Sequence, residues 1–172
     1  VSKFKYYLII LGCIHLLFSR TSKQGEAFEY FLEGEYEILQ NNFRKAEKYY
    51  SRALSLSPDS PTILQSLVDI KSYQGQYPDA IKYLEKIMEL EPDNKNSGLA
   101  LYALYLQERD TIKAELLLDT LIIYHPGDHD ILFSRANTQF SNHNWNGLLK
   151  TYQDIYISDP DQDDLLIKIY EI

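Results

Sequence analysis

The chain has 172 residues, enough for one domain with its own core, and 45% of them are hydrophobic, which is ordinary for a globular protein. All 25 acidic residues lie after residue 25, where they face 13 basic residues, so this part carries a net charge of −12. Such an acidic part argues against a nucleic-acid partner, because phosphate binding needs a basic surface. Cys13 is the only cysteine, which excludes an intrachain disulfide and a cysteine-based zinc site.

The N-terminal residues 1–18 combine a basic start with an apolar run from Tyr6 to Phe18. Thirteen helical residues at 1.5 Å each are too short to cross a bilayer core of about 30 Å. A basic start followed by an apolar run of this length is typical of a secretory signal peptide. We therefore predict a signal peptide or membrane anchor over residues 1–18, followed by a polar linker over residues 19–26.

The four residues that end at Cys13, with the sequence ILGC, resemble the lipobox of bacterial lipoproteins. In that family the cysteine is lipidated and becomes the first mature residue. The apolar run continues past it from Ile14 to Phe18, where a polar tether is usual. Lipidation of Cys13, a cleaved signal or uncleaved anchor, and a cytosolic protein therefore stay open as three interpretations. We expect export to a bacterial cell envelope, either lipid-anchored or periplasmic, with a cytoplasmic location as the alternative.

From residue 27 onward, the sequence repeats with a period of 34 residues, which is the period of a two-helix solenoid. Four prolines mark the period, at positions 58, 92, 126 and 160. The stretch from Asn41 to Pro58 places apolar residues at spacings of three, four and seven, as on one face of a helix, and the pattern returns three times. Because proline cannot continue a helix, each repeat is expected to close just before its proline.

Each repeat is predicted to hold two amphipathic helices joined by a short turn. In the first repeat we expect helices over about Phe28–Gln40 and Phe43–Leu56, and Gly75 marks the inner turn of the second repeat. The repeats are expected at residues 27–60, 61–94, 95–128 and 129–162, with a partial repeat at 163–172. Aspartates near the starts of following helices suit helix capping and the helix dipole; they are Asp59, Asp93, Asp128, Asp161 and Asp163.

These residues resemble the tetratricopeptide repeat family. Its pattern has a small residue in the first helix, an early alanine, an aromatic and a small residue in the second, and a closing proline. Repeat one matches closely, with Gly34, Ala46, Tyr50, Ala53 and Pro58. The resemblance covers residues 27–162 and implies an all-α fold, a right-handed α-solenoid of four full helix-turn-helix repeats plus a partial fifth, within a domain over residues 27–172.

Two later repeats depart from the family's pattern. Tyr102 stands where repeat three should have a small residue, and Leu148 stands where repeat four should have alanine. These larger residues predict wider or altered helix packing in the two repeats. Most of the tyrosines, among them Tyr50, Tyr77, Tyr83 and Tyr152, fall on expected packing faces, and so does Trp145, so we assign them to the core.

No catalytic constellation is present: the chain has neither a GxxxxGK[ST] phosphate loop nor a GxSxG elbow. The cluster from His125 to Asp130, HPGDHD, contains metal-ligand residues, but proline and glycine keep His125 and His129 off one helical face. The period favours an inter-repeat turn there. The segment from Asp159 to Asp164 begins like a calcium loop but lacks the required glycine. We predict no enzymatic activity, no cofactor and no metal.

The family resemblance implies that the first helices line a concave groove that holds a peptide or a helix. An exposed apolar stripe usually marks a partner site, and the rival interpretation is that some positions pack against the next repeat. The groove residues carried over are Phe31, Glu35, Ile38, Gln65, Asp69, Tyr73, Leu99, Ala103, Leu106, Phe133, Asn137 and Phe140. The family's clamp for C-terminal carboxylates uses Lys, Arg and Asn, whereas this chain has Phe31, Glu35, Gln65 and Asp69 there, which disfavours a carboxylate ligand.

The sequence therefore predicts a non-catalytic protein–protein interaction scaffold, exported or tethered to a membrane through its N-terminus. Its groove is expected to take a peptide or helix with apolar anchors and some positive charge, and no nucleic acid. The alternative is a targeting or regulatory repeat region of a longer protein whose enzymatic or other domain lies beyond residue 172. The apolar segment at residues 163–172 motivates that alternative, because a solenoid normally ends in a helix with a polar outer face.

Overall fold

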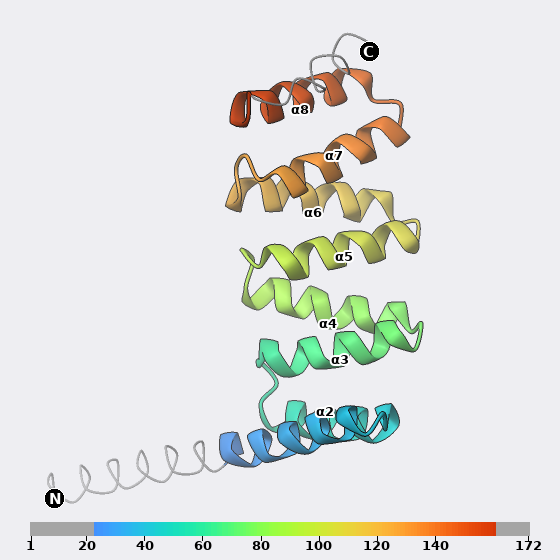
Figure 1. Ribbon diagram of the computed structural model, residues 1–172, viewed down its shortest axis with the longest axis vertical. Helices are drawn as coiled ribbons and strands as arrows, with labels where there is room; N and C mark the ends of the chain where they lie inside the picture. The colour runs from blue at the N-terminus through green and yellow to red at the C-terminus, as the bar shows by residue number, and fades with distance from the viewer. Residues whose placement is uncertain (1–22, 161–172) are drawn as a thin grey trace, which may run out of the picture. The chain divides into compact units, whose positions relative to one another are not determined.

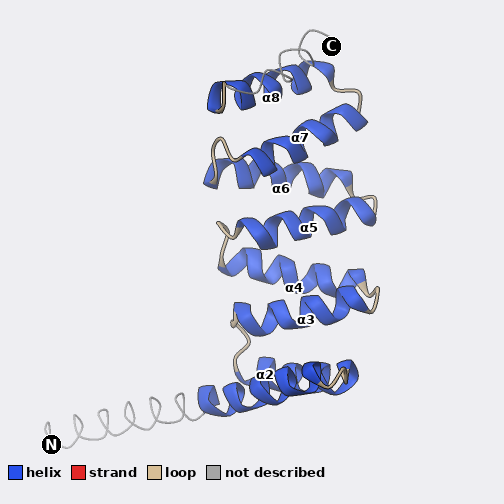
Figure 2. Cartoon of the chain, viewed as in Figure 1, coloured by secondary structure: helices blue, strands red, loops and turns tan. Residues whose placement is uncertain are grey.

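The computed structural model describes residues 23–160, and every regular element in that range is an α-helix, as Figure 1 and Figure 2 show. After a helix over residues 23–39 come α2 (Phe43–Leu56), α3 (Pro61–Tyr73), α4 (Tyr77–Leu90), α5 (Lys95–Gln107), α6 (Thr111–Tyr124), α7 (His129–Ser141) and α8 (Trp145–Ser158). The predicted all-α solenoid of helical repeats is confirmed. The segments predicted as a signal peptide and as a partial repeat at 163–172, and the lipidation site predicted at Cys13, lie outside the described residues.

The second helix of each repeat ends two residues before the closing proline. These helices, α2, α4, α6 and α8, end at Leu56, Leu90, Tyr124 and Ser158. A proline has no backbone N–H and its ring clashes with the preceding turn, so the helix cannot run through it. The predicted ends of these second helices are therefore confirmed, whereas the first helix of repeat one, expected over about Phe28–Gln40, spans residues 23–39.

The first helices of repeats two, three and four begin at side-chain caps. Asp128 accepts backbone hydrogen bonds from Asp130 and Ile131 at the start of α7, as the sequence predicts. At α3 and α5 the capping residue stands one position later than the aspartates assigned to this role: Ser60 caps Ile63, and Asn94 caps Ser97. Ser and Asn are as effective as Asp at this position, so the correction changes the residue but not the boundary.

A left-handed residue closes the inner turn of every described repeat. Asn41, Gly75, Arg109 and His143 have φ values of 58°, 70°, 62° and 55°. They stand 34 residues apart, so the period is present in the backbone as well as in the side chains. Only the second repeat uses glycine, the residue that adopts this conformation without strain.

The chain divides into two compact units, one up to Tyr83 and one from Leu84. In the first unit, Ala46, Tyr50 and Ala53 of α2 form a core with α3, whose buried residues there are Ile63, Leu67 and Ile70. In the second unit α5 packs on α6, α6 on α7 and α7 on α8. The largest fully buried side chains of that unit include Leu118, Leu121, Ile131, Leu148 and Ile155.

Close helix contact depends on glycine at two places. A Cβ atom on Gly34 would overlap the ring of Tyr50, and one on Gly98 would stand 2.5 Å from a methyl carbon of Leu121. In repeat three the close contact is therefore made at Gly98, four residues before Tyr102. Tyr102 is the large residue that stands where the family's pattern has a small one. Tyr102 is 8% exposed, and its hydroxyl lies 2.7 Å from the hydroxyl of Thr138 on α7. Tyr102 therefore links repeat three to repeat four through this hydroxyl contact.

The linker predicted over residues 19–26 ends earlier than expected, because residues 23–26 are already helical. The linker assignment rested on polarity, but Lys, Gln and Glu are good helix formers, and all four residues are exposed. Polarity alone does not distinguish an exposed helical turn from a loop. Among residues 23–160, no helix has both the length and the apolar character needed to cross a membrane.

Candidate functional site

The predicted groove residues divide into two groups according to their burial. The register that contains Phe31, Gln65, Leu99 and Phe133 is half-buried in all four repeats. Phe31 and Ile38 pack against the core of the first unit, and Phe133 packs against Leu132 and Ile155 in the second. These side chains are mainly structural. The register that contains Glu35, Asp69, Ala103 and Asn137 is exposed in every repeat.

Glu35 is held in place by a buried tyrosine. The Tyr50 hydroxyl donates a 2.6 Å hydrogen bond to Glu35 Oε1, while the ring of Tyr50 is only 1% exposed. Burial, followed by the hydrogen bond to Glu35, raises the pKa of the Tyr50 phenol above its ordinary value. The phenol therefore stays protonated and keeps donating well above neutral pH. Glu35 presents a fixed negative charge at the surface of helix 23–39.

The exposed apolar surface of repeat one consists of residues that the sequence analysis missed. Phe28, Leu32 and Leu39 are 60%, 50% and 78% exposed. With Glu35 they are spaced by four, three and four residues, so they share one face of helix 23–39. We call these four residues the repeat-one stripe. Buried Ala27 and Gly34, seven apart, mark the packed side of the helix, about 100° around the axis from the stripe, and this pattern could have located the stripe.

In repeat two, the groove residues make contacts with their own neighbours. Gln65 donates a 2.9 Å hydrogen bond to Asp69 on the same helix. Tyr73 is 73% exposed and stacks on Phe43, with ring centroids 4.5 Å apart. A stacked, exposed aromatic ring offers apolar contact area at little further cost in side-chain entropy. Tyr73 therefore adds an exposed aromatic side chain to the first unit.

In the second unit, the corresponding surface is smaller and more polar. The positions equivalent to the repeat-one stripe are Asn96, Ala100, Ala103 and Gln107 on α5, and Asp130, Ser134, Asn137 and Ser141 on α7. Phe140 is 59% exposed and meets the edge of Trp145 at 5.6 Å, while Leu106 is 38% exposed. Trp145 itself is 44% exposed, so its assignment to the core was wrong. At the first position of α8 it packs against Phe140, near the end of α7, and against His143 of the turn between the two helices.

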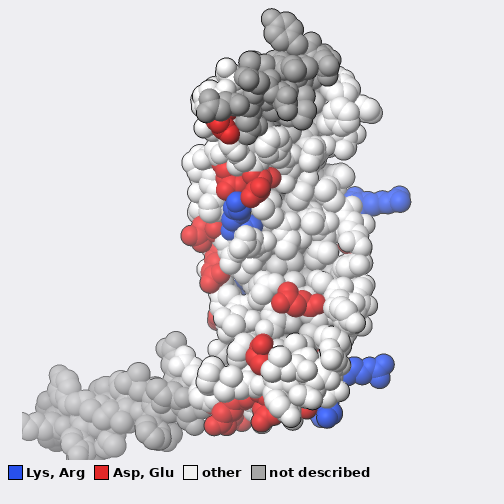
Figure 3. Space-filling model, in the orientation of Figure 1, with Lys and Arg blue, Asp and Glu red and all other residues white. Residues whose placement is uncertain are grey.

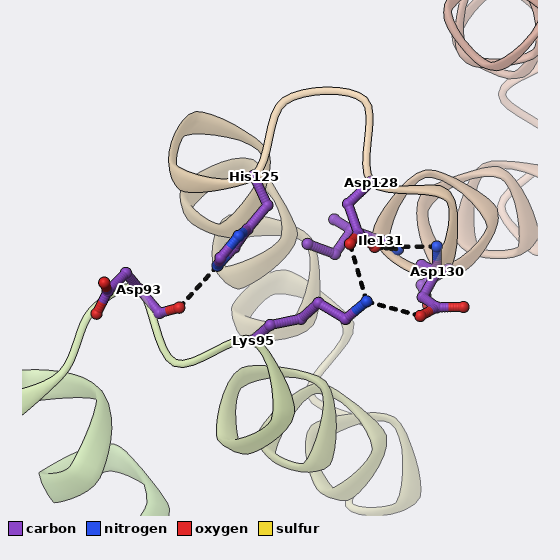
Figure 4. Close-up of polar contacts among 7 residues, drawn as sticks. Asp93, Lys95, His125, Asp128, Asp130 and Ile131 are labelled. Carbon is purple, nitrogen blue, oxygen red and sulfur yellow. Dashed lines mark hydrogen bonds and ion pairs between the residues drawn. The ribbon is translucent and has the colours of Figure 1, made fainter. Parts of the chain in front are cut away.

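The HPGDHD cluster forms an inter-repeat junction, shown in Figure 4. Lys95, at the start of α5, donates to Asp128 at 2.8 Å and to Asp130 at 2.7 Å. His125 Nε2 lies 2.7 Å from the backbone oxygen of Asp93. Although burial raises the pKa of Asp128, the hydrogen bonds from Lys95 and from backbone amides hold it below its ordinary value. These contacts join the turn between repeats three and four to the turn between repeats two and three.

The two histidines of this cluster do not converge on one point. His129 Nε2 lies 3.1 Å from the Ser158 hydroxyl, whereas His125 contacts Asp93. Within residues 23–160 no group of three or more His, Cys, Asp or Glu side chains is arranged to hold a metal ion. The calcium-like segment from Asp159 to Asp164 lies largely outside the described residues.

Comparisons with known proteins agree on one family. A family model described as tetratricopeptide repeat matches residues 27–60, and a second model with the same description matches residues 73–136, together more than half of the chain. Human tetratricopeptide repeat protein 7B is 31% identical over 114 residues, which are 66% of this chain. The chain spans only 13% of that relative's length.

Solved structures share the fold. A tetratricopeptide repeat protein from Parabacteroides merdae superposes with a TM-score of 0.71 at 17% identity, covering 83% of this chain and 57% of that one. MamA gives 0.67 at 17% identity, covering 84% and 79%. YrrB, described as a TPR protein with an unusual peptide-binding site, gives 0.64 at 16% identity, covering 84% and 74%. At such identities the likeness concerns the fold alone.

Proposed function

Because the chain belongs to the tetratricopeptide repeat family, whose members generally mediate contacts between proteins, we propose that it is a non-catalytic scaffold that binds a segment of a partner protein on its first helices. The observation that carries this proposal is the repeat-one stripe. Its three apolar side chains are each at least half exposed, and a carboxylate fixed by Tyr50 lies among them. Exposed apolar residues gathered on one face are typical of a partner site.

The chemistry of the stripe selects the kind of partner. Phe28, Leu32 and Leu39 would receive apolar anchors spaced along one face of an amphipathic helix, or alternate side chains of an extended segment. Glu35 would pair with a lysine or arginine on that segment, because its carboxylate is already positioned. Asp69 of repeat two adds a second exposed negative charge in the same register. A basic amphipathic segment is therefore the expected ligand.

The test uses the full chain in a mild detergent and a fluorescein-labelled amphipathic peptide with leucines at helical spacing and flanking lysines. Anisotropy gives the Kd for wild type and for a Leu32→Glu, Leu39→Glu variant, both of whose substituted side chains are exposed. The matched control is Ile112→Glu, Ile123→Glu on α6, where both residues are also exposed, at 80% and 77%.

We expect the stripe variant to bind at least about tenfold more weakly, since each lost apolar anchor contributes on the order of 1 kcal/mol or more. The α6 control should bind like wild type. Equal affinities for the two variants, with helicity unchanged by circular dichroism, would exclude the stripe as the binding surface.

For location, we propose an exported protein of the bacterial cell envelope that is tethered through its N-terminus. The basic start and apolar run of residues 1–18, with the lipobox-like sequence ending at Cys13, support this proposal. Cells grown with radiolabelled palmitate should label the wild-type protein but not a Cys13→Ala variant. Label in neither protein, with the chain recovered from the cytosol, would contradict it.

A second candidate role is that of a repeat region within a longer protein. The favouring observation is that the chain spans only 13% of the length of its human relative. An antibody against the repeats would then detect a native protein much larger than 20.1 kDa. Detection of a single species near that mass would rule this role out.

A further inference from the structure

Helix α2 is basic within an acidic protein. It carries Arg44, Lys45, Lys48 and Arg52 against a single acid, Glu47. Acidic side chains gather along the lower edge of the view in Figure 3, where Figure 1 draws helix 23–39. The first, third and fourth of these bases are spaced by four residues, so they share one face of α2.

The acid on α2 is already neutralised by a residue from another helix. Glu47 accepts a 2.6 Å hydrogen bond from Lys71 of α3 and a 3.1 Å bond from Gln74. The Lys71 contact is the largest of the causes that hold the pKa of Glu47 below its ordinary value. Glu47 is therefore already paired with Lys71, so it does not neutralise the positive charge of the neighbouring bases of α2.

Three bases of α2, Arg44, Lys48 and Arg52, have no acidic partner within residues 23–160. Lys45 reaches Glu37, at 3.5 Å, but neither Lys48 nor Arg52 forms an ion pair there. Arg52 instead lies 5.7 Å from the centre of the Tyr30 ring. Glu26 and Glu33 stand one turn on either side of Tyr30, yet they line neither of the hollows that border this strip. The positive charge of Lys48 and Arg52 is thus available to a ligand.

The bases border an aromatic hollow of about 760 Å³ between helix 23–39 and α2. Tyr30 and Tyr49 line it, with ring centroids 6.5 Å apart, together with Lys45, Lys48 and Arg52. A second hollow, of about 640 Å³, shares Lys48 and Ser51 with it and reaches Arg44, Gln74, Gln76 and the Lys71-paired Glu47. Volumes of about 300–1,000 Å³ are usual for ligand sites. Lys48 therefore stands between two hollows.

We propose that this strip of α2 binds a short acidic segment of a protein that carries an aromatic side chain. Its carboxylates would pair with Lys48 and Arg52, and its aromatic ring would pack against Tyr30 and Tyr49. The acidic surroundings limit the ligand's length, because α2 spans only about 20 Å and a nucleic acid or an anionic membrane would extend beyond it into repulsion. This site shares no residue with the repeat-one stripe, so either proposal can be contradicted by its experiment without affecting the other.

The probe is a fluorescein-labelled octapeptide of six glutamates and two tyrosines, and the comparison peptide has glutamine in place of glutamate. Both are titrated with the full chain in mild detergent at about 50 mM salt, where exposed charges are weakly screened. The test variant is Lys48→Glu, Arg52→Glu. The matched control, Lys82→Glu, Lys150→Glu, makes the same change in net charge at two exposed lysines elsewhere.

We expect the acidic peptide to bind wild type at least tenfold more tightly than the glutamine peptide. The α2 reversal should abolish that preference, while the control keeps most of it. Equal losses in the two variants would show that only net charge matters and would overturn the proposal, as would no preference for the acidic peptide. If salt-sensitive self-association also disappears in the α2 variant alone, the acidic segment belongs to a second copy of this chain.

Discussion

The ring of Tyr50 fills the space in which a Cβ atom on Gly34 would stand, so helix 23–39 and α2 approach each other closely only because residue 34 has no side chain. The same tyrosine is almost fully buried and fixes Glu35 at the surface through its hydroxyl. One pair of residues therefore sets both the packing of repeat one and the position of its exposed carboxylate.

Gly34→Ala should destabilise the protein by about 1–3 kcal/mol, because the added methyl group forces the Tyr50 ring or the helix to shift. In an ordinary helix the same change stabilises by about 0.5–1 kcal/mol. Gly25→Ala provides the control, since Gly25 lies in the same helix with nothing within 4 Å of the added atom. Urea denaturation of the two variants should give opposite signs. A stabilised Gly34→Ala protein would contradict the close contact.

Arg109→Gly should stabilise the protein by about 0.5–1 kcal/mol. Arg109 has a φ of 62°, in the left-handed region that costs a non-glycine residue about 1–2 kcal/mol, partly offset by the greater freedom of glycine in the unfolded chain. Gly75→Ala, at the equivalent turn with a φ of 70°, should destabilise by about 1 kcal/mol. Thermal melts check both changes. Shifts of the same sign in both variants would mean that the turns are not equivalent.

Stability should decline above about pH 10. Burial raises the pKa of Tyr50 and of Tyr105, and hydrogen bonds to Glu35 and Glu85 raise them further. The unfolded phenols ionise near pH 10 while the folded ones stay protonated, so this stabilisation is complete below that pH and is lost as pH rises towards the folded pKa values. A Tyr50→Phe, Tyr105→Phe variant should show a shallower decline in urea midpoint between about pH 9 and 11. An unchanged slope would show that other groups cause the decline.

Lys95→Met should lower the melting temperature at pH 7, because Lys95 supports both Asp128 and Asp130 at the junction between repeats. The pKa of Asp128 is depressed, so its ionised form contributes stability above its unfolded value of 3.8, and this contribution is lost as pH falls through the folded value. The difference between variant and wild type should therefore shrink by about pH 2. Lys82→Met, which removes an exposed pair with Asp79, is the control and should change little.

The sequence by itself determined where the helices end and how the chain repeats. Pro58 and its equivalents stop helices through their own ring and missing N–H, which needs no information from the rest of the protein. The inner turn at Gly75 follows in the same way from a residue that accepts a positive φ. Local chemistry is read directly from residue types, and a fixed period carries one assignment to every repeat.

Only the tertiary structure decided which residues of the first helices face solvent. Phe31 and Phe28 are three positions apart and equally apolar, but Phe31 packs near Tyr50 while Phe28 is 60% exposed. The sequence likewise did not show that Trp145 is exposed. Nor did it show that Tyr30 and the bases of α2 line one hollow. Burial depends on how closely a neighbouring helix approaches, and that distance is set by contacts such as Gly34 with Tyr50 rather than by the pattern of either helix alone.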